Sequence, residues 1–201
     1  MIQKVLGLMA AAYLVGSIPF SYLVARARGV DLRTVGSGNI GAANVYRACG
    51  RNAFLVAVVL DMLKGIVPTA LARHTLKLPP IAVSLIGGSA MIGHTYSIFM
   101  NFRGGKAVAT GGGALLMLSP LAMISGVGAW VVGFMITRIS AVGSLAAAAV
   151  AAVISIAQMA QGRLERVYGI FGCIACGVVV FLHRANIRRM LEGTENRFQQ
   201  L

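Results

Sequence analysis

The chain alternates between long apolar runs and short polar segments. Several of the apolar runs approach or reach the roughly 20 residues that a helix needs to cross a bilayer. These runs cover residues 5–25, 53–72, 80–100, 111–137, 139–160 and 167–182. The main polar segments are 26–52, 101–110 and a tail that begins at His183. This pattern predicts an all-α protein, a polytopic membrane helix bundle.

The run at 111–137 contains Ser119 and Pro120 near its middle. Because proline breaks or kinks a helix, we expect this run to form two short membrane helices or a segment that enters and returns. The whole chain then has about seven membrane segments. With no linker or internal repeat in view, residues 1–201 are expected to form a single membrane domain.

The composition supports a membrane location. Hydrophobic residues make up 58% of the chain and charged residues 11%, and the mean hydropathy is +0.81. A soluble domain carries about a quarter charged residues. The apolar run at 5–25 is too long for a cleaved signal peptide and is followed by Arg26 and Arg28, so it is interpreted as the first membrane helix.

The distribution of positive charge predicts the orientation. Lys and Arg outnumber Asp and Glu by 18 to 5, for a formal charge of +13. With the N-terminus outside and the C-terminus cytoplasmic, twelve Lys and Arg residues fall in inside segments and five outside, which satisfies the positive-inside rule. The basic residues lie mainly between apolar runs, which favours membrane lipids or an anionic substrate as partners and not nucleic acid.

The first polar segment contains GSGNIGAANVYR at 36–47. Its glycines let backbone amides approach an anion, and Ser37, Asn39 and Asn44 can donate hydrogen bonds. Arg47 can hold a phosphate through two parallel hydrogen bonds. The GxGxxG pattern within it follows a membrane helix and no buried strand, so it does not indicate dinucleotide binding. The alternative is a flexible loop whose arginines set the topology.

The second polar segment is GHTYSIFMNFRGGKAVAT at 93–110. Its core, Gly104, Gly105 and Lys106, is interpreted as a phosphate nest made of bare amides and one ammonium group. A helix that starts near Thr110 would direct its positive end at the same site. His94 is interpreted as a structural histidine.

The third polar segment is HRANIRRMLEGTE at 183–195. His183 and Asn186 share a face if the preceding helix continues through them. The alternative is a basic juxtamembrane stretch that binds anionic lipid. Within the apolar run at 53–72, Asp61 and Lys64 stand one helical turn apart and are expected to pair inside the bundle.

No pattern predicts a metal site or a cofactor. Cys173 and Cys176 form a CxxC, but they lie inside an apolar run without a second pair or a histidine cluster. They are interpreted as small packing residues.

Taken in this order and spacing, the three polar segments resemble those of the bacterial acyl-phosphate:glycerol-3-phosphate acyltransferases, which are membrane-bound. A lesser match is DMLKG at 61–65. The chain departs from the usual family pattern where it has Ala43 for Thr, Ser97 for Pro, Arg103 for Lys and Ala107 for Gly.

The resemblance implies transfer of a fatty acyl group from acyl phosphate to the 1-hydroxyl of glycerol 3-phosphate. The products are lysophosphatidic acid and phosphate, in the first acylation of phospholipid synthesis, without a cofactor. It also implies a multi-pass protein of the bacterial plasma (inner) membrane with its active site facing the cytoplasm. A functional link to the enzyme that makes acyl phosphate is expected.

The resemblance further implies roles for individual residues. Ser37, Arg47 and Ser144 hold glycerol 3-phosphate, and Asn39 belongs to the same binding set. Gly104, Gly105 and Lys106 cradle the acyl phosphate. His183 and Asn186 orient the attacking hydroxyl or the carbonyl, and either His183 or a substrate phosphate oxygen is the base. Glu195 anchors the tail. The expected catalytic residues are Ser37, Arg47, Lys106, His183 and Asn186.

Two other functional classes fit the same composition. A transporter for a phosphorylated anion also places basic residues in a bundle, but transporter sites tend to lie at the midplane between repeats. Here the polar segments gather at one face of the predicted bundle. The other class is a non-catalytic lipid-binding membrane protein.

Overall fold

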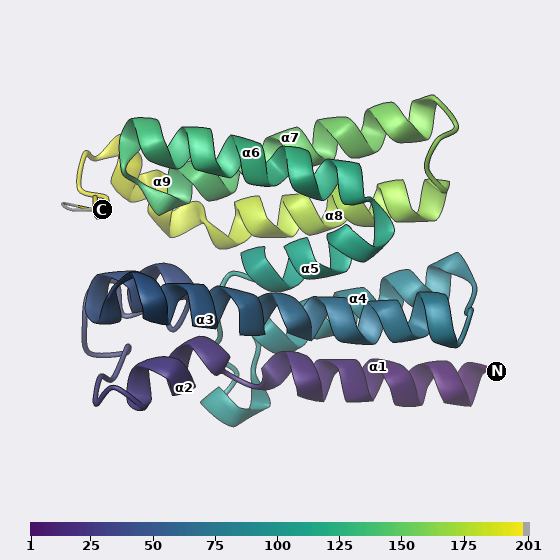
Figure 1. The fold of residues 1–201 in the computed structure, drawn as a ribbon, viewed down its shortest axis with the longest axis horizontal. Helices are drawn as coiled ribbons and strands as arrows, with labels where there is room; N and C mark the ends of the chain where they lie inside the picture. The colour runs from purple at the N-terminus through teal and green to yellow at the C-terminus, as the bar shows by residue number, and fades with distance from the viewer. Residues whose placement is uncertain (199–201) are drawn as a thin grey trace. The chain divides into compact units, whose positions relative to one another are not determined.

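The protein is built from helices that form two compact units. The computed structural model describes residues 1–198, and every regular element within them is helical (Figure 1). The first unit is Met1–Met117 and the second is Leu118–Leu201. The all-α expectation is confirmed. The single domain expected over residues 1–201 remains a prediction, and its last three residues lie outside the described residues.

The first unit is organised around two helix pairs. α1 packs along α4, and α2 packs along α3. Two short elements, the π-helix η1 and the 3₁₀-helix η2, follow α3 and α4. The elements of this unit are α1 (Ile2–Ser17), α2 (Phe20–Arg26), α3 (Ala42–Ala70), η1 (Leu71–Thr75), α4 (Pro80–Thr95), η2 (Ile98–Met100) and most of α5 (Val108–Leu118).

Two helices of this unit differ from the apolar runs that the sequence pattern predicts. The apolar run at 5–25 is divided between α1 and α2, because Pro19 has no N–H group to continue the ladder. The helix predicted from residue 53 begins eleven residues earlier, at Ala42, and is kinked at Gly50, whose φ of 78° favours glycine. The kink separates the turns that carry Arg47 from the apolar length of α3.

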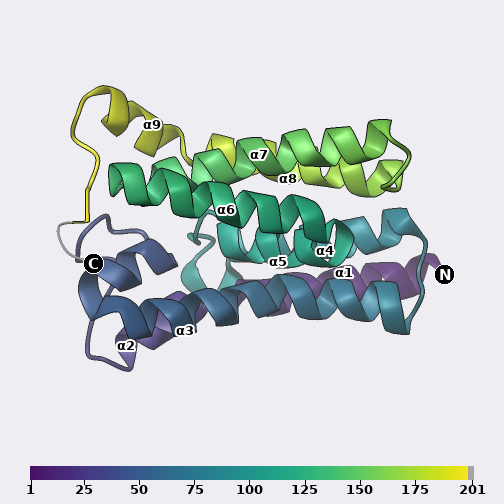
Figure 2. The ribbon, with the colours of Figure 1, turned by 45° about the horizontal axis from the view of Figure 1, so that its top comes forward.

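The second unit contains α6 (Pro120–Thr137), α7 (Ser140–Ala160), α8 (Arg166–Leu182) and α9 (Arg184–Leu191). α7 packs against both α6 and α8 (Figure 2). The break expected in the run at 111–137 is confirmed at Ser119, whose hydroxyl accepts a hydrogen bond from the amide of Ala122 and caps α6. The same hydroxyl donates to Gln158 Oε1 at 2.6 Å and so ties the cap to α7.

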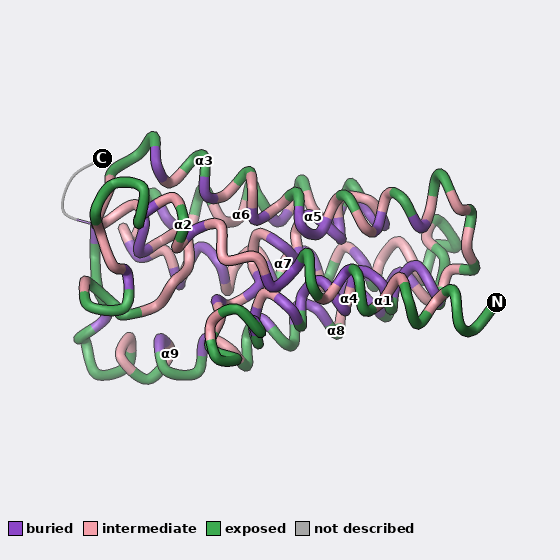
Figure 3. The backbone as a smooth tube through the Cα atoms, turned by 90° about the horizontal axis from the view of Figure 1, so that it is seen from below, coloured by how far each residue is buried: buried purple, intermediate pink, exposed green. Residues whose placement is uncertain are grey.

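The helices have the length and composition of membrane spans. Within residues 1–198, five spans are long and apolar enough to cross a membrane, or up to six if α8 and α9, which meet at a 52° bend, count as one span. Along α3 the buried residues line one edge and the exposed residues the other (Figure 3). That exposed edge is apolar, as a lipid-facing surface is, and carries Leu55, Val56, Val59, Leu63 and Val67. The multi-pass architecture is confirmed, whereas the number of seven segments and the orientation remain predictions.

Candidate active site

Asn44 holds the first polar loop in its folded shape. Its side chain is 1% exposed, and Nδ2 donates to the carbonyls of Leu32 and Val35, both at 3.0 Å. Its Oδ1 accepts from the amide of Ser37 at 3.2 Å. The expectation that Asn44 offers its hydrogen bonds to a substrate is therefore wrong, because the loop itself uses them.

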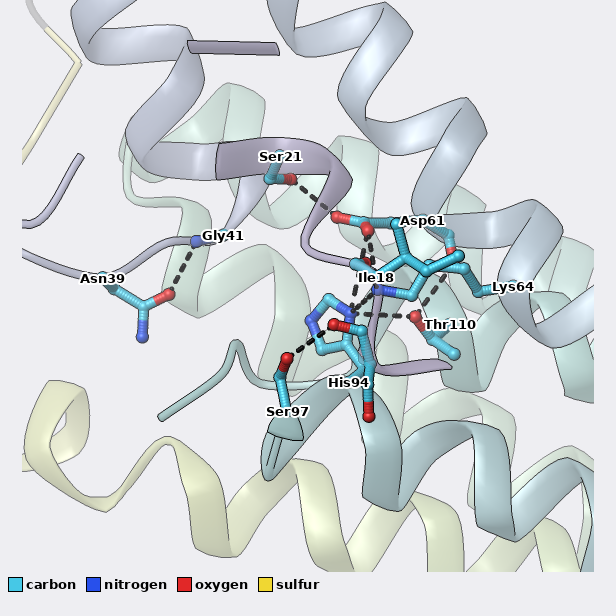
Figure 4. A network of polar contacts seen from close by, with 10 residues as sticks. Ile18, Ser21, Asn39, Gly41, Asp61, Lys64, His94, Ser97 and Thr110 are labelled. Atoms are coloured by element: carbon cyan, nitrogen blue, oxygen red, sulfur yellow. Dashed lines mark hydrogen bonds and ion pairs between the residues drawn. The ribbon is translucent and has the colours of Figure 1, made fainter. Parts of the chain in front are cut away.

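The other polar residues of this loop lie at its surface and at the start of α3. Ser37 is exposed, and its Oγ accepts from the amide of Asn39 at 3.4 Å. Asn39 in turn accepts from the amide of Gly41, the residue before α3, at 2.9 Å (Figure 4). Arg47 is half-buried in the second turn of α3. This places a hydroxyl, an amide and a guanidinium on one short stretch of chain.

Arg33 is committed to a partner in the same loop. Its guanidinium donates to both carboxylate oxygens of Asp31, at 3.0 and 2.6 Å. Hydrogen bonds from the Arg33 side chain and amide hold the pKa of Asp31 well below its usual range. Arg33 also lies over the ring of Tyr22, 5.4 Å from the centroid. Arg33 is thus part of the internal structure of this loop.

The ion pair predicted between Asp61 and Lys64 is present and buried. The distance from Lys64 Nζ to Asp61 Oδ1 is 3.1 Å, and both side chains are 2% exposed. Asp61 Oδ2 accepts from the hydroxyl of Ser21 at 2.6 Å, and its backbone carbonyl accepts from the hydroxyl of Thr110 at 2.9 Å (Figure 4). The pair therefore joins α2, α3 and α5.

Lys64 also contacts the break between α1 and α2. Its ammonium donates to the carbonyl of Ile18 at 2.7 Å and contacts His94 Nδ1 at 3.0 Å. The neighbouring carbonyl, Ser17 O, accepts from Ser97 Oγ at 2.5 Å. A small recess opens beside this network and brings together residues of both polar segments of the first unit. It is lined by Ser17, Pro19, Ser21, Ile40, Asp61, Lys64, His94, Ser97 and Gly105.

The glycines of the Gly-Gly-Lys segment have a role different from the expected one. The amide of Gly104 donates to Thr95 O at 2.9 Å, and that of Gly105 donates to His94 O at 3.0 Å. A nest of bare amides at these two positions is therefore wrong. A Cβ at Gly104 would lie 2.0 Å from His94 O, so glycine allows the segment to approach the end of α4. Lys106 follows, half-buried, two residues before α5 begins at Val108.

His183 lies at a bend and has a defined tautomer. α8 ends and α9 begins around it, at an angle of 52°, so the helix does not run straight through His183 and Asn186 as the sequence pattern assumed. His183 is 4% exposed, and its Nδ1 is 2.8 Å from Val179 O. Because a carbonyl only accepts, Nδ1 carries the hydrogen, and the neutral ring presents Nε2 as an acceptor.

The side chains of Asn186 and Glu195 form a buried hydrogen bond with each other. Asn186 is 6% exposed, and its Nδ2 donates to Glu195 Oε1 at 2.7 Å, which orients the amide with its oxygen at the other end. Glu195 Oε2 accepts from Arg189 Nε at 2.7 Å. The pairing of Glu195 with an arginine is as expected. The tail is held further by Phe198, whose ring packs edge-on against Phe134 at 5.2 Å.

The remaining predicted residue, Ser144, lies in the second turn of α7. It is 6% exposed, and its hydroxyl donates to the carbonyl of Ser140 at 3.0 Å. The predicted residues therefore divide between the two units, with Ser37 to Lys106 in the first and Ser144 to Glu195 in the second. The convergence of the two sets remains a prediction. Across residues 1–198, no group of three or more His, Cys, Asp and Glu side chains is arranged to hold a metal ion.

Several residues of the network were missed by sequence reasoning. Ser21, Ser97 and Thr110 are single hydroxyls in apolar surroundings, and no local pattern marks them. Ser97 had a weak signal, because it replaces the proline usual in the resembling family. Its hydroxyl now has a use that proline could not provide, since it satisfies the carbonyl at the end of α1.

Comparison with known proteins gives matches along nearly the whole chain. Residues 6–193 match the model of a family described as "Glycerol-3-phosphate acyltransferase". The chain is 58% identical over 196 residues to the glycerol-3-phosphate acyltransferase of Roseiflexus sp. (strain RS-1), covering 98% of this chain and 96% of the relative. It is 45% identical over 192 residues to that of Geobacter sulfurreducens, covering 96% of each.

Two solved structures share the fold. Both are crystal structures of PlsY (YgiH), described as an integral membrane glycerol 3-phosphate acyltransferase. The glycerol 3-phosphate form superimposes with a TM-score of 0.89 at 34% identity and covers 97% of this chain and 96% of that chain. The lysophosphatidic acid form gives a TM-score of 0.88 at 32% identity, with coverage of 97% and 95%.

The tail contact predicts a specific loss of stability. Glu195→Gln removes the charge that faces Arg189 and should lower the free energy of unfolding by about 1–3 kcal/mol, as expected for a charged hydrogen bond with a buried partner. The matched control is Glu192→Gln, because Glu192 pairs with Arg188 on the exposed surface and should contribute less than about 1 kcal/mol. Unfolding titrations in detergent micelles measure both. Equal effects of the two substitutions would show that Glu195 is not an anchor.

Proposed function

The chain belongs to the glycerol-3-phosphate acyltransferase family, and we propose that it acylates the 1-hydroxyl of glycerol 3-phosphate with an acyl group taken from acyl phosphate. The product is lysophosphatidic acid, and inorganic phosphate is released. Family membership over residues 6–193 is the observation that carries this proposal. The acyl phosphate donor is the part that rests on the match of the three polar segments.

The charges of these segments suit two phosphate substrates. Both reactants are anions, and bringing them together requires concentrated positive charge in a site of restricted water access. Arg47 and Lys106 supply it in the first unit, each half-buried. Arg47 binds the phosphate of glycerol 3-phosphate with two parallel hydrogen bonds, with Ser37, Asn39 and Ser144 as further donors, and Lys106 binds the phosphate of acyl phosphate. The apolar helices around them accommodate the acyl chain.

The two glycines before Lys106 contribute by shape. Since their amides are already bonded to the end of α4, Gly104 and Gly105 serve the acyl phosphate by holding the segment that precedes Lys106 against His94 and the recess. Both glycines therefore remain part of the proposed binding site, but they act by allowing close packing and not by donating their amides to a phosphate.

The chemistry requires no covalent enzyme intermediate. The 1-hydroxyl oxygen of glycerol 3-phosphate attacks the acyl carbonyl carbon, the new ester bond forms, and the bond from that carbon to the phosphate oxygen breaks. The hydroxyl proton passes to His183 Nε2, which the bond between Nδ1 and Val179 O leaves as the accepting nitrogen. Asn186, which Glu195 holds in place, helps to orient the attacking hydroxyl or the acyl carbonyl. The departing phosphate is itself an acceptor and is the alternative base.

The same proposal includes a location. The protein spans the bacterial plasma (inner) membrane with its N-terminus outside, and the site opens to the cytoplasm. The positive-inside count of Lys and Arg supports this orientation. Because acyl phosphate is the acyl donor, the proposal also includes a functional link to the enzyme that makes acyl phosphate.

The reaction is tested with the purified protein in detergent micelles. Acyl phosphate and labelled glycerol 3-phosphate should give labelled lysophosphatidic acid with sequential kinetics, because both substrates must be bound before transfer. Ping-pong kinetics, or an acylated Ser or Cys trapped with acyl phosphate alone at a rate competent for turnover, would contradict the mechanism. Uptake of glycerol 3-phosphate into sealed vesicles without product would instead favour the transporter.

Arg47 allows a sharper test of the phosphate site. Arg47→Lys keeps the charge but removes the two-point hydrogen bond, and it should reduce kcat/KM by about 30- to 150-fold, or about 2–3 kcal/mol. Arg51→Lys is the matched control, because Arg51 is exposed one turn further along α3 and should keep wild-type kinetics. If Arg47→Lys kept the wild-type kcat/KM, Arg47 would not bind the substrate phosphate.

A further inference from the structure

The Lys64 ammonium has as many partners as it has hydrogens. It contacts Ile18 O at 2.7 Å, His94 Nδ1 at 3.0 Å and Asp61 Oδ1 at 3.1 Å. An ammonium group has three N–H donors and no acceptor. Each of its three neighbours must therefore accept, and His94 Nδ1 can do so only if it carries no hydrogen.

This arrangement defines the tautomer of His94. With Nδ1 as the acceptor, the hydrogen of the neutral imidazole lies on Nε2. Thr110 is compatible with this assignment, since its hydroxyl is a donor with two acceptors in reach, Asp61 O at 2.9 Å and His94 Nδ1 at 3.1 Å. His94 is therefore the reverse of His183, whose Nδ1 carries the hydrogen. One ring presents a donor at Nε2 and the other an acceptor.

The donor at Nε2 faces the Gly-Gly-Lys segment. In Figure 4 the second ring nitrogen points away from Asp61 and Lys64. A Cβ placed on Gly105 would lie 2.3 Å from Nε2 and 3.1 and 3.2 Å from the two adjacent ring carbons, so any side chain here would collide with the ring. Glycine at position 105 therefore lets the backbone of the segment lie against the Nε2 side of His94. His94 and Gly105 both line the recess.

No group among residues 1–198 takes the hydrogen of Nε2. All polar contacts of the His94 ring within this part of the chain involve Nδ1, although its side chain is only 9% exposed. A donor held in a sheltered position, next to the glycine that precedes Lys106, is suited to an anionic oxygen, for which a hydrogen bond from a fixed donor is strongest.

We propose that His94 is a substrate-contacting residue whose Nε2–H donates a hydrogen bond to a phosphoryl oxygen bound at Gly105 and Lys106. Lys64 is its positioning residue, because the ammonium fixes the ring orientation by donating to Nδ1, and Asp61 holds Lys64 in place. This inference deepens the proposed function and rests on it for the identity of the substrate. The phosphoryl group belongs either to acyl phosphate or to glycerol 3-phosphate, and kinetics distinguishes the two.

Two substitutions separate the contact with substrate from the contact with Lys64. In His94→Asn the amide oxygen takes the place of Nδ1, so Lys64 keeps its third acceptor while the donor at Nε2 is lost. In His94→Gln the amide nitrogen takes the place of Nε2 and the donor is kept. His94→Asn should raise the KM for one phosphate substrate by about 10- to 100-fold, the range expected for a hydrogen bond to a charged group. His94→Gln should recover part of that loss.

The kinetic result has clear readings. A raised KM for acyl phosphate shows that the phosphoryl oxygen belongs to acyl phosphate. A raised KM for glycerol 3-phosphate shows that it belongs to glycerol 3-phosphate. Wild-type KM values for both substrates in a folded His94→Asn variant would overturn the proposal. So would a His94→Gln variant that loses as much affinity as His94→Asn, because restoring a donor at the place of Nε2 would then have no effect.

A second measurement keeps His94 itself unchanged, so it does not depend on whether a His94 variant folds. In protein labelled with ¹⁵N-histidine, the imidazole resonances of His94 are separated from those of His74 and His183 by substituting the latter two. They should show the Nε2–H tautomer and should shift when inorganic phosphate or glycerol 3-phosphate is added. The Nδ1–H tautomer, or no response to either anion, would overturn the proposal. If wild-type protein made no lysophosphatidic acid, the proposed function would fail, and the phosphate titration would still decide the role of His94.

Discussion

The buried ion pair of Asp61 and Lys64 is the interaction on which the first unit depends. A charge placed in a membrane span costs several kcal/mol unless it is paired and hydrogen-bonded. Here the cost is offset because the ammonium has three acceptors, and the carboxylate accepts from both Lys64 and Ser21. Removing any one partner leaves a polar group unsatisfied in a region without bulk water. The positions of α1, α2, α3, α4 and α5 in this unit are therefore linked through a few atoms.

The pair also explains why a broken helix is tolerated. Pro19 interrupts the first apolar run and leaves carbonyls at the end of α1 without intrahelical donors. Lys64 satisfies Ile18 O and Ser97 satisfies Ser17 O. A cation near a helix C-terminus is also favoured by the helix dipole. The recess opens at this break, next to the segment that carries Lys106, so the same contacts that stabilise the break shape the place where a phosphate is proposed to bind.

The sequence predicted those features that depend on local pattern. Run lengths indicated membrane helices, Ser119-Pro120 indicated a break, and the three-residue spacing of Asp61 and Lys64 indicated an ion pair. It could not predict where backbone amides point. Gly104 and Gly105 suggest a nest by composition, but whether their N–H groups face a ligand or the end of α4 depends on tertiary packing. The donors to the carbonyls of Ser17 and Ile18 could not be predicted either, because Ser97 and Lys64 lie 80 and 46 residues further along the chain. The tautomers of His94 and His183 follow only from which neighbours accept.

A double-mutant cycle at Asp61 and Lys64 tests this account most directly. The free energy of unfolding is measured in micelles for Asp61→Asn, Lys64→Met and the double variant. Each single substitution should destabilise the protein by about 3–5 kcal/mol because it leaves the other charge buried and unpaired. The double variant should be less destabilised than the sum of the two, with a coupling energy of about 1–3 kcal/mol. Additive losses would contradict the claim that the pair acts as a unit on which the candidate site depends.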